Sequence, residues 1–387
     1  MKNKLLLFSL LLFSFVAIWS CNSIVEDKEN TSSKKMDIIA YYYGDSSGFK
    51  TYDTKQLTHI IYSFLQLKGN KIAFNKPADS LAVVKLVSLK EEHPSLKVLI
   101  SMGGWGSCET CSDVFSTEQG RTAFSQSVKN MLEATHTDGI DLDWEYPSIE
   151  GFPGHRFTPE DKHNFTLLLE TLRKTIGDSY EISFAAGGYT EYLQKSIEWD
   201  KVMPLVNRVN LMSYDLTNGY SVLTGHHTPL YSTPQQVEST DHGVRYLDSI
   251  GVPLNKVVIG AAFYARVFEQ VDSTHHGLHQ SCKFKTCFNY KNFKDSLSPD
   301  LGFTYYWDSI AKAPYAYSPN KKEFATFDNK ESVALKVQYV RDKKLGGIMF
   351  WELTEDKEQK GLLNVMYEIM IGEHNTDKPS AQMPLRN

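Results

Sequence analysis

The chain has 387 residues, 41 Lys and Arg against 46 Asp and Glu, and a net charge of -5, so it has no basic field that would gather phosphates, which argues against a nucleic-acid partner. The length fits either one large α/β barrel or two ordinary domains. Aromatic residues make up 12% of the chain, including 21 Tyr and 6 Trp, and supply flat faces that suit both sugar binding and core packing.

The first 21 residues have the pattern of an export signal. Lys2 and Lys4 form a charged start, and residues 5–19 form an apolar run. This run is shorter than the roughly 20 apolar residues of a membrane span. It ends in Ile18-Trp19-Ser20-Cys21, which resembles the lipobox of bacterial lipoproteins, in which the Cys carries lipid and becomes the mature N-terminus. The resemblance implies an exported protein anchored through Cys21 to the outer membrane or cell surface, with simple secretion as the alternative.

Two polar segments flank the part of the chain that we expect to fold. Residues 22–35 are mostly polar and charged, which is typical of a flexible tether. Residues 373–387 are also polar and are expected to fray at the end of the chain. The sequence therefore predicts a folded domain over residues 36–372.

Beyond Cys21, four cysteines form two close pairs, Cys108 with Cys111 and Cys282 with Cys287. In an exported chain, this spacing predicts two local disulfides. A thioredoxin-like redox motif at the first pair and a zinc site built from all four cysteines are the alternatives. The redox motif lacks a surrounding βαβ pattern of thioredoxin size, and zinc would require two distant loops to converge.

Eight short apolar runs of strand character follow the tether, and helical periodicity recurs between several of them. The runs lie at residues 38–43, 59–65, 98–101, 140–144, 182–186, 209–214, 257–263 and 348–351. Helical patterns lie at residues 81–92, 121–134, 158–176, 235–250, 332–343 and 359–371. This alternation is typical of parallel α/β sheets, and eight strands favour a closed (β/α)8 TIM barrel over an open sheet.

The clearest helical pattern has signals at both ends. Thr158 is the expected N-cap, Pro159 occupies the first helical position, and acidic residues follow in the first turn. Gly177 is expected to end the helix. Apolar residues recur between these signals at helical spacing, namely Phe165, Leu168, Leu169, Leu172 and Ile176.

One connection is far longer than the others. About residues 266–328 separate the seventh strand from the seventh helix, which predicts a small inserted subdomain at the C-terminal face of the barrel. Its aromatic residues are expected either to form one wall of a substrate cleft or to fill the insertion's own core. They include Tyr305, Tyr306, Trp307, Tyr315 and Tyr317.

The fourth strand carries a row of acids. Side chains alternate along a strand, so Asp141, Asp143 and Glu145 share one face, roughly 7 Å from one to the next, and Asp138 falls on the other parity. A solvated acidic face is the structural alternative, but strands of a parallel barrel are covered on both sides. Carboxyls held this close inside a barrel resist ionising together, so we expect one proton to be retained near neutral pH. Glu145 lies at the end of the strand where barrel enzymes place their chemistry.

This strand resembles the D-G-x-D-x-D-x-E signature of glycoside hydrolase family 18, the chitinases and their relatives. Four further segments resemble motifs of the same family, in the same order along residues 36–372. They are Ser101 to Gly104, Met212 to Asp215, Phe263 to Arg266 and Gly346 to Glu352. The third of these has Ala265 where the family more often has Gly.

The resemblance implies a chitinase that cuts β-1,4 linkages between N-acetylglucosamine units by a retaining, substrate-assisted mechanism. Glu145 would act as acid and then as base. The substrate's acetamide oxygen would be the nucleophile and would give an oxazolinium ion. Asp143 would hold the acetamide N–H, with Asp141 sharing a proton behind it, and Tyr214 would orient the acetamide carbonyl.

The resemblance also implies residues that bind the substrate. Trp351 would form the apolar floor under the sugar. Asp215 and Arg266 would bind sugar hydroxyls, with a structural ion pair as the alternative. Tyr41 would contact the acetamide pocket. Gly103 and Gly104 would admit the substrate or form a tight turn, Met212 would pack beneath the site, and Trp105 would contact the substrate.

Neither a metal nor a cofactor is expected. His226 and His227 are adjacent, so they point differently, and they lack a partner at ligand spacing. We expect a monomer whose partners are chitin or N-acetylglucosamine oligosaccharides, in contact with a membrane only through the N-terminal lipid.

Three other functions compete with the chitinase. An endo-β-N-acetylglucosaminidase acting on N-glycans shares the carboxylate signature, and the long insertion favours chitin over that substrate. A chitinase-like lectin commonly lacks the terminal Glu that is present here as Glu145. A thiol-redox protein built on Cys108 and Cys111 would leave the motifs on the other strands unexplained.

Overall fold

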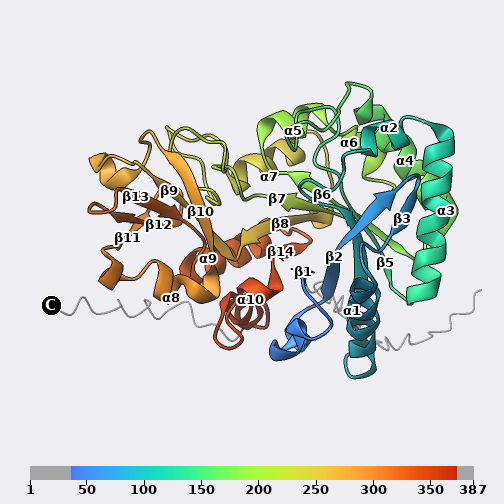
Figure 1. Cartoon of the computed structure of the whole chain (residues 1–387), viewed down its shortest axis with the longest axis horizontal. Coiled ribbons are helices and arrows are strands. Elements are labelled where there is room, and N and C mark those ends of the chain that lie inside the picture. The colour runs from blue at the N-terminus through green and yellow to red at the C-terminus, as the bar shows by residue number, and fades with distance from the viewer. Residues whose placement is uncertain (1–35, 373–387) are drawn as a thin grey trace, which may run out of the picture. The chain divides into compact units, whose positions relative to one another are not determined.

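The computed structural model describes residues 36–372, and within them eight parallel strands close into a barrel (Figure 1). The strands run in the order β1-β14-β8-β7-β6-β5-β4-β2, and pairing of β1 with β2 closes the barrel. A short antiparallel strand, β3 (Lys71–Ala73), extends β2. The barrel strands are β1 (Asp37–Tyr42), β2 (His59–Lys68), β4 (Lys97–Gly103), β5 (Gly139–Asp143), β6 (Glu181–Gly187), β7 (Arg208–Met212), β8 (Val257–Ala262) and β14 (Gly347–Trp351). The predicted barrel is confirmed.

Helices occupy the connections between strands. Each of the six predicted helical segments overlaps a helix, and Gly177 follows the end of α4 as its C-cap. Helix α4 begins at Asp161 and not at Thr158, since the backbone N–H and the hydroxyl of Thr158 both donate to the Asp161 carboxylate ahead of the first turn. The helices are α1 (Pro77–Ser88), α2 (Cys111–Phe115), α3 (Glu118–Thr135), α4 (Asp161–Ile176), α5 (Thr190–Lys195), α6 (Trp199–Val202), α7 (Thr240–Ser249), α8 (Phe293–Ser296), α9 (Lys330–Asp342) and α10 (Leu362–Met370).

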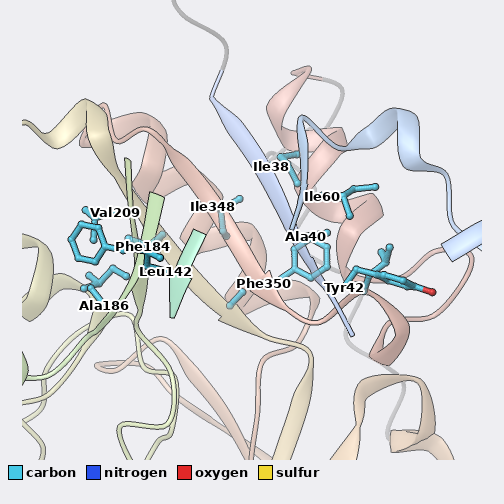
Figure 2. Packing of buried hydrophobic residues seen from close by; sticks show 14 of the residues in the cluster. Ile38, Ala40, Tyr42, Ile60, Leu142, Phe184, Ala186, Val209, Ile348 and Phe350 are labelled. Carbon is cyan, nitrogen blue, oxygen red and sulfur yellow. The ribbon is translucent and has the colours of Figure 1, made fainter. Parts of the chain in front are cut away.

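Alternation along the strands produces two apolar layers. One parity packs outward against the helices, and Figure 2 shows part of this layer, including Ile38, Phe184 and Ile348. The other parity fills the barrel interior with a separate buried cluster, to which Ile39 and Met349 belong. Because both faces of each strand are covered, a polar side chain of the inward parity is buried and must find a partner inside the barrel.

The insertion forms its own antiparallel sheet, which confirms the predicted subdomain (Figure 1). Its strands are β9 (Tyr264–Glu269), β10 (Lys283–Asn289), β11 (Thr304–Asp308), β12 (Ala313–Ser318) and β13 (Glu323–Thr326), in the order β10-β9-β13-β12-β11. Tyr315 and Tyr317 are buried in the core of this sheet, and Tyr306 packs on it. These three rings therefore fill the insertion, whereas Tyr305 remains 45% exposed.

A buried ion pair joins the end of the insertion to the barrel. Asp328 and Lys336 are both fully buried and bond to each other. The Asp328 carboxylate also accepts the Thr228 hydroxyl and the backbone N–H of Ala262. Removal of either charged partner would leave a buried charge uncompensated, so this contact fixes the insertion against the loop after β7 and against β8.

The two cysteine pairs behave differently. Cys108 and Cys111 form a disulfide, with Cα atoms 5.2 Å apart. Cys282 and Cys287 are free thiols, so the prediction of a second disulfide is wrong. The reason is the extended backbone that leads from Cys282 into β10, along which five residues span roughly 17 Å, whereas a disulfide needs Cα atoms within roughly 7 Å. The Cys287 thiol contacts the guanidinium of Arg266 instead.

The signal at residues 1–21 with Cys21, the tether at 22–35 and the tail at 373–387 lie outside the described residues. Between residues 36 and 372, no helix combines the length and the apolar character that crossing a bilayer requires.

Candidate active site

Asp141 lies in the barrel interior at the centre of a hydrogen-bond network. Its Oδ2 accepts the hydroxyls of Tyr41 at 3.0 Å and Ser101 at 2.9 Å. Its Oδ1 accepts the Ser183 hydroxyl at 2.6 Å and the Asn210 amide at 3.1 Å. Burial raises the pKa of Asp141 and these donors oppose the rise, which leaves the pKa above its ordinary value. Four donors from four strands therefore fix this carboxyl.

Ser183 and Asn210 were not predicted from the sequence. Ser183 lies directly opposite Asp141 in the register of β5 and β6, and Asn210 lies on β7. Both are fully buried, and each strand is otherwise apolar apart from a charged residue at its start, Glu181 or Arg208. The available signal was a small polar residue within an apolar stretch of a barrel strand, because such a residue requires a partner inside the barrel.

Asp143 is the last residue of β5, and Glu145 lies two residues beyond it. Burial raises the pKa of Asp143 well above its ordinary value, and the negative charges of Glu145 and Asp141 raise it further. Burial also raises the pKa of Glu145 to about 7, against a hydrogen bond from Tyr146 and with help from the charge of Asp215. The two carboxyls therefore retain a proton between them near neutral pH. Asp143 Oδ1 has no hydrogen-bond partner among residues 36–372.

Tyr214 follows β7 and points into the barrel. Its side chain is buried, and its hydroxyl lies 4.0 Å from the sulfur of Met349. Burial, followed by the charge of Asp143, raises the pKa of Tyr214 well above its ordinary value, so the phenol keeps its proton and can donate. Met212 lies two residues earlier and packs on the apolar interior cluster, as expected for a residue that packs beneath the site.

Asp215 and Arg266 form an ion pair with each other. The Tyr264 hydroxyl also donates to Asp215, at 2.7 Å, and His227 lies beside the same oxygen. Burial would raise the pKa of Asp215, but His227 and Arg266 beside the carboxylate hold it well below its ordinary value. The structure therefore contains the ion pair that sequence analysis kept as an alternative, and a role for either residue as a sugar ligand stays a prediction.

Trp351 ends β14 beside three other rings. Phe64 stacks on it at 5.5 Å between ring centroids, with an interplanar angle of 14°. Tyr41 and Tyr43 lie at 6.0 and 6.3 Å. Phe64 and Tyr43 were not identified from the sequence, since no local sequence pattern marks a ring that packs against a residue of a distant strand.

A second aromatic group surrounds Trp105, on the loop after β4. Trp105 is 46% exposed and lies 5.6 Å from Phe152 and 6.3 Å from both Tyr146 and Tyr220, between ring centroids. Tyr220 comes from the loop after β7 and is 65% exposed. Exposed aromatic faces of this kind suit contact with pyranose rings.

Gly103 and Gly104 have positive φ angles of 120° and 86°. A Cβ on Gly103 would lie 2.1 Å from the carbonyl oxygen of Asp143, and one on Gly104 would lie 2.6 Å from the Phe64 ring. The Gly104 backbone also donates to the Asp143 carbonyl oxygen at 2.8 Å. These glycines are therefore needed for the tight turn against β5, which was one of the two expected roles.

The adjacent histidines have separate carboxylate partners. His226 Nε2 lies 3.0 Å from Asp308, and His227 Nδ1 lies 3.4 Å from Asp215. In the part of the chain that the structure describes, no three His, Cys, Asp or Glu side chains are grouped so that they could hold a metal ion.

Comparison with known proteins places this site in context. Residues 37–356 match the model of the glycosyl hydrolases family 18. Chitinase A1 of Niallia circulans is 33% identical over 302 residues, which cover 71% of this chain and 43% of that protein. The chain therefore spans less than half of that relative's length.

Two solved structures share the fold. Chitinase ChiA74 from Bacillus thuringiensis superposes with a TM-score of 0.81 at 26% identity, covering 88% of this chain and 70% of that one. A family 18 N-acetylglucosaminidase from Paenibacillus barengoltzii superposes with a TM-score of 0.78 at 33% identity, covering 86% of this chain and 99% of that one. The barrel, the acidic row on β5 and the match over residues 37–356 lead to one assignment: the chain belongs to glycoside hydrolase family 18.

Proposed function

We propose that this chain is a chitinase that hydrolyses β-1,4 linkages between N-acetylglucosamine units, with retention of configuration, as a monomer. The observation that carries the proposal is the acidic row that runs along β5 and two residues past its end. Its last member, Glu145, has a pKa raised to about 7 beside Asp143, so a proton is available for transfer at neutral pH. Chitinase A1 and ChiA74, whose names state this activity, support the substrate class.

In the proposed reaction, Glu145 donates its proton to the glycosidic oxygen as the bond to the anomeric carbon breaks. The acetamide oxygen of the same sugar forms a bond to that carbon, which gives an oxazolinium ion. Water then attacks the anomeric carbon from the side that the leaving group vacated and gives up a proton to Glu145, while the bond from that carbon to the acetamide oxygen breaks and the acetamide is regenerated. The acid is thereby restored, and the product keeps the β configuration.

The other carboxyls and the phenol have supporting roles in this proposal. Asp143 Oδ1, which has no protein partner among the described residues, is free to accept the acetamide N–H, and the negative charge of Asp143 balances the oxazolinium. Asp141, held by four donors, fixes the position of its neighbour on β5. Tyr214 keeps its proton and donates it in a hydrogen bond to the acetamide carbonyl, which orients the nucleophile.

Trp351 is proposed as the floor of the sugar-binding site. Phe64, stacked on it, and Tyr41, beside it, limit the positions that the indole can take. An indole face held in one orientation packs against the axial C–H groups of a pyranose without losing further side-chain entropy on binding.

Product analysis tests the substrate class. Purified protein is expected to cut N-acetylglucosamine hexamer into shorter oligomers and to leave an N-glycopeptide intact, as judged by mass spectrometry. Release of the glycan from the peptide with the hexamer left uncut would assign the chain to the endo-β-N-acetylglucosaminidases instead. Binding of the hexamer without cleavage of either substrate would indicate a lectin.

We also propose that Cys21 carries a lipid that anchors the exported protein, on the strength of the apolar run and lipobox-like residues that precede it. Expressed in a bacterial host, the protein is expected to fractionate with membranes, and the Cys21→Ser variant is expected to be soluble. The Cys282→Ser variant changes a free thiol elsewhere in the chain and serves as the control. Equal solubility of the parent and the Cys21→Ser variant would exclude the anchor.

A further inference from the structure

We propose that His227 is a positioning residue, which holds the carboxylate of Asp215 in the orientation that the proposed site requires. The inference rests on the proposed role of Glu145 as the acid. It assigns a function to a residue that the motifs on the barrel strands do not include.

Contacts on both sides fix the position of His227. Its backbone N–H donates to the Thr326 hydroxyl on β13 at 3.0 Å, and its carbonyl accepts the backbone N–H of Leu216 at 3.0 Å. The side chain is completely buried, and the ring packs 5.2 Å from the ring of Tyr264. The position of the imidazole is therefore fixed between the insertion and the segment that follows Asp215.

Asp215 is the polar group that the imidazole ring contacts. Nδ1 of His227 lies 3.4 Å from Asp215 Oδ1, and neither ring nitrogen has a well-aligned hydrogen bond to any described residue. Burial lowers the pKa of His227, against the pull of Asp215, so the ring is neutral at pH 7. A neutral imidazole with its proton on Nδ1 satisfies this contact by directing the N–H toward the carboxylate.

Asp215 needs such support because its backbone is unusual. Its φ angle is 57°, in the left-handed region that residues other than glycine rarely adopt. Three side chains converge on its carboxylate: Arg266, Tyr264 and His227. The first two lie on β9 of the insertion, and the third is tied to β13, so the insertion orients this carboxylate from two strands.

The negative charge of Asp215 acts on the acid Glu145. After burial, this charge is the cause that raises the pKa of Glu145, and it also raises the pKa of Tyr214. Other charged groups lie near His227, Asp215 and Glu145. They are Arg266 and Asp328 for the first, Glu355 for the second and Asp143 for the third. Without the His227 contact, only Arg266 and Tyr264 would orient the carboxylate, so the field of Asp215 at Glu145 is expected to change.

Two amide substitutions test the roles of the two ring nitrogens of His227 separately. The amide of Asn takes roughly the place of Nδ1, and the longer Gln places its amide near Nε2. His227→Gln therefore removes the contact with Asp215, whereas His227→Asn keeps a donor near it. His226 is the matched control, since it is adjacent and equally buried but pairs through Nε2 with Asp308, which His226→Gln preserves.

The experiment measures kcat and KM on an N-acetylglucosamine oligomer across pH for the full chain and the three variants. His227→Gln is expected to lower kcat about tenfold through misplacement of the site, with KM within about twofold. Its alkaline limb of kcat/KM should move by about 0.5 unit, since a displaced Asp215 carboxylate changes the field that helps to raise the pKa of Glu145. His227→Asn and His226→Gln should keep the alkaline limb of the parent protein.

An NMR titration of the Asp215 carboxyl provides a readout that does not depend on activity. Its pKa is expected to rise in His227→Gln and to stay unchanged in His226→Gln. The proposal would be overturned if His227→Gln kept both the alkaline limb of the parent protein and the parent pKa of Asp215. It would also be overturned if His226→Gln shifted the limb and the pKa as much as His227→Gln does. A parent protein that cuts no substrate would instead refute the proposed function, while the titration would still decide the role of His227.

Discussion

Replacement of Glu145 by Gln is expected to lower kcat by a factor of roughly 10² to 10⁴ or more, because the amide keeps the shape and hydrogen bonding of the acid but has no proton to transfer. Binding of the oligosaccharide, measured by calorimetry, should survive, since the contacts to the sugar rings are unchanged. In the parent enzyme, kcat/KM should fall as pH rises through about 7, where Glu145 loses its proton.

Glu150 supplies the control for this substitution. It is an exposed carboxylate on the same loop, five residues later, so Glu150→Gln makes the same chemical change outside the site. The control is expected to keep parent activity. Near-normal turnover in Glu145→Gln would overturn the assignment of the acidic row on β5.

A substrate whose scissile sugar lacks the N-acetyl group is expected to remain uncut. The acetamide oxygen is the proposed nucleophile, and an intramolecular group in the right geometry corresponds to an effective concentration of roughly 10⁵ M or more. Its loss should therefore bring cleavage at that linkage below detection in a chromatographic assay. An oligomer that carries one free amine two or more sugars from the scissile bond should still be cut. Comparable cleavage at a deacetylated sugar would mean that the protein supplies the nucleophile.

The barrel could be predicted because its strands and helices leave strong local patterns. Parallel strands covered on both faces are continuous apolar runs, and the connecting helices show a clear 3.6-residue period. The strands of the insertion were not delineated from the sequence, because they are short and partly exposed, and β10 has an almost wholly exposed pattern. The failed pairing of Cys282 with Cys287 has the same origin, since close spacing in sequence becomes a long distance on an extended strand.

Local periodicity predicted only the acidic row of the site. Asp141, Asp143 and Glu145 follow from the two-residue period of β5 and its continuation past Asp143. The partners that complete the site come from other strands and loops: Ser183 and Asn210 reach Asp141 across the barrel, and His227 reaches Asp215 from a long loop. Such contacts depend on register and loop path, which no local pattern in a single sequence records.

The most direct test of the proposed mechanism is the anomeric configuration of the first product, followed by proton NMR during hydrolysis of an N-acetylglucosamine oligomer. Attack by the substrate's own acetamide and then by water inverts the anomeric carbon twice, so the β-anomer should appear first and equilibrate with the α-anomer only later. Initial formation of the α-anomer would show a single displacement by water and would contradict substrate-assisted catalysis with Glu145 as acid and base.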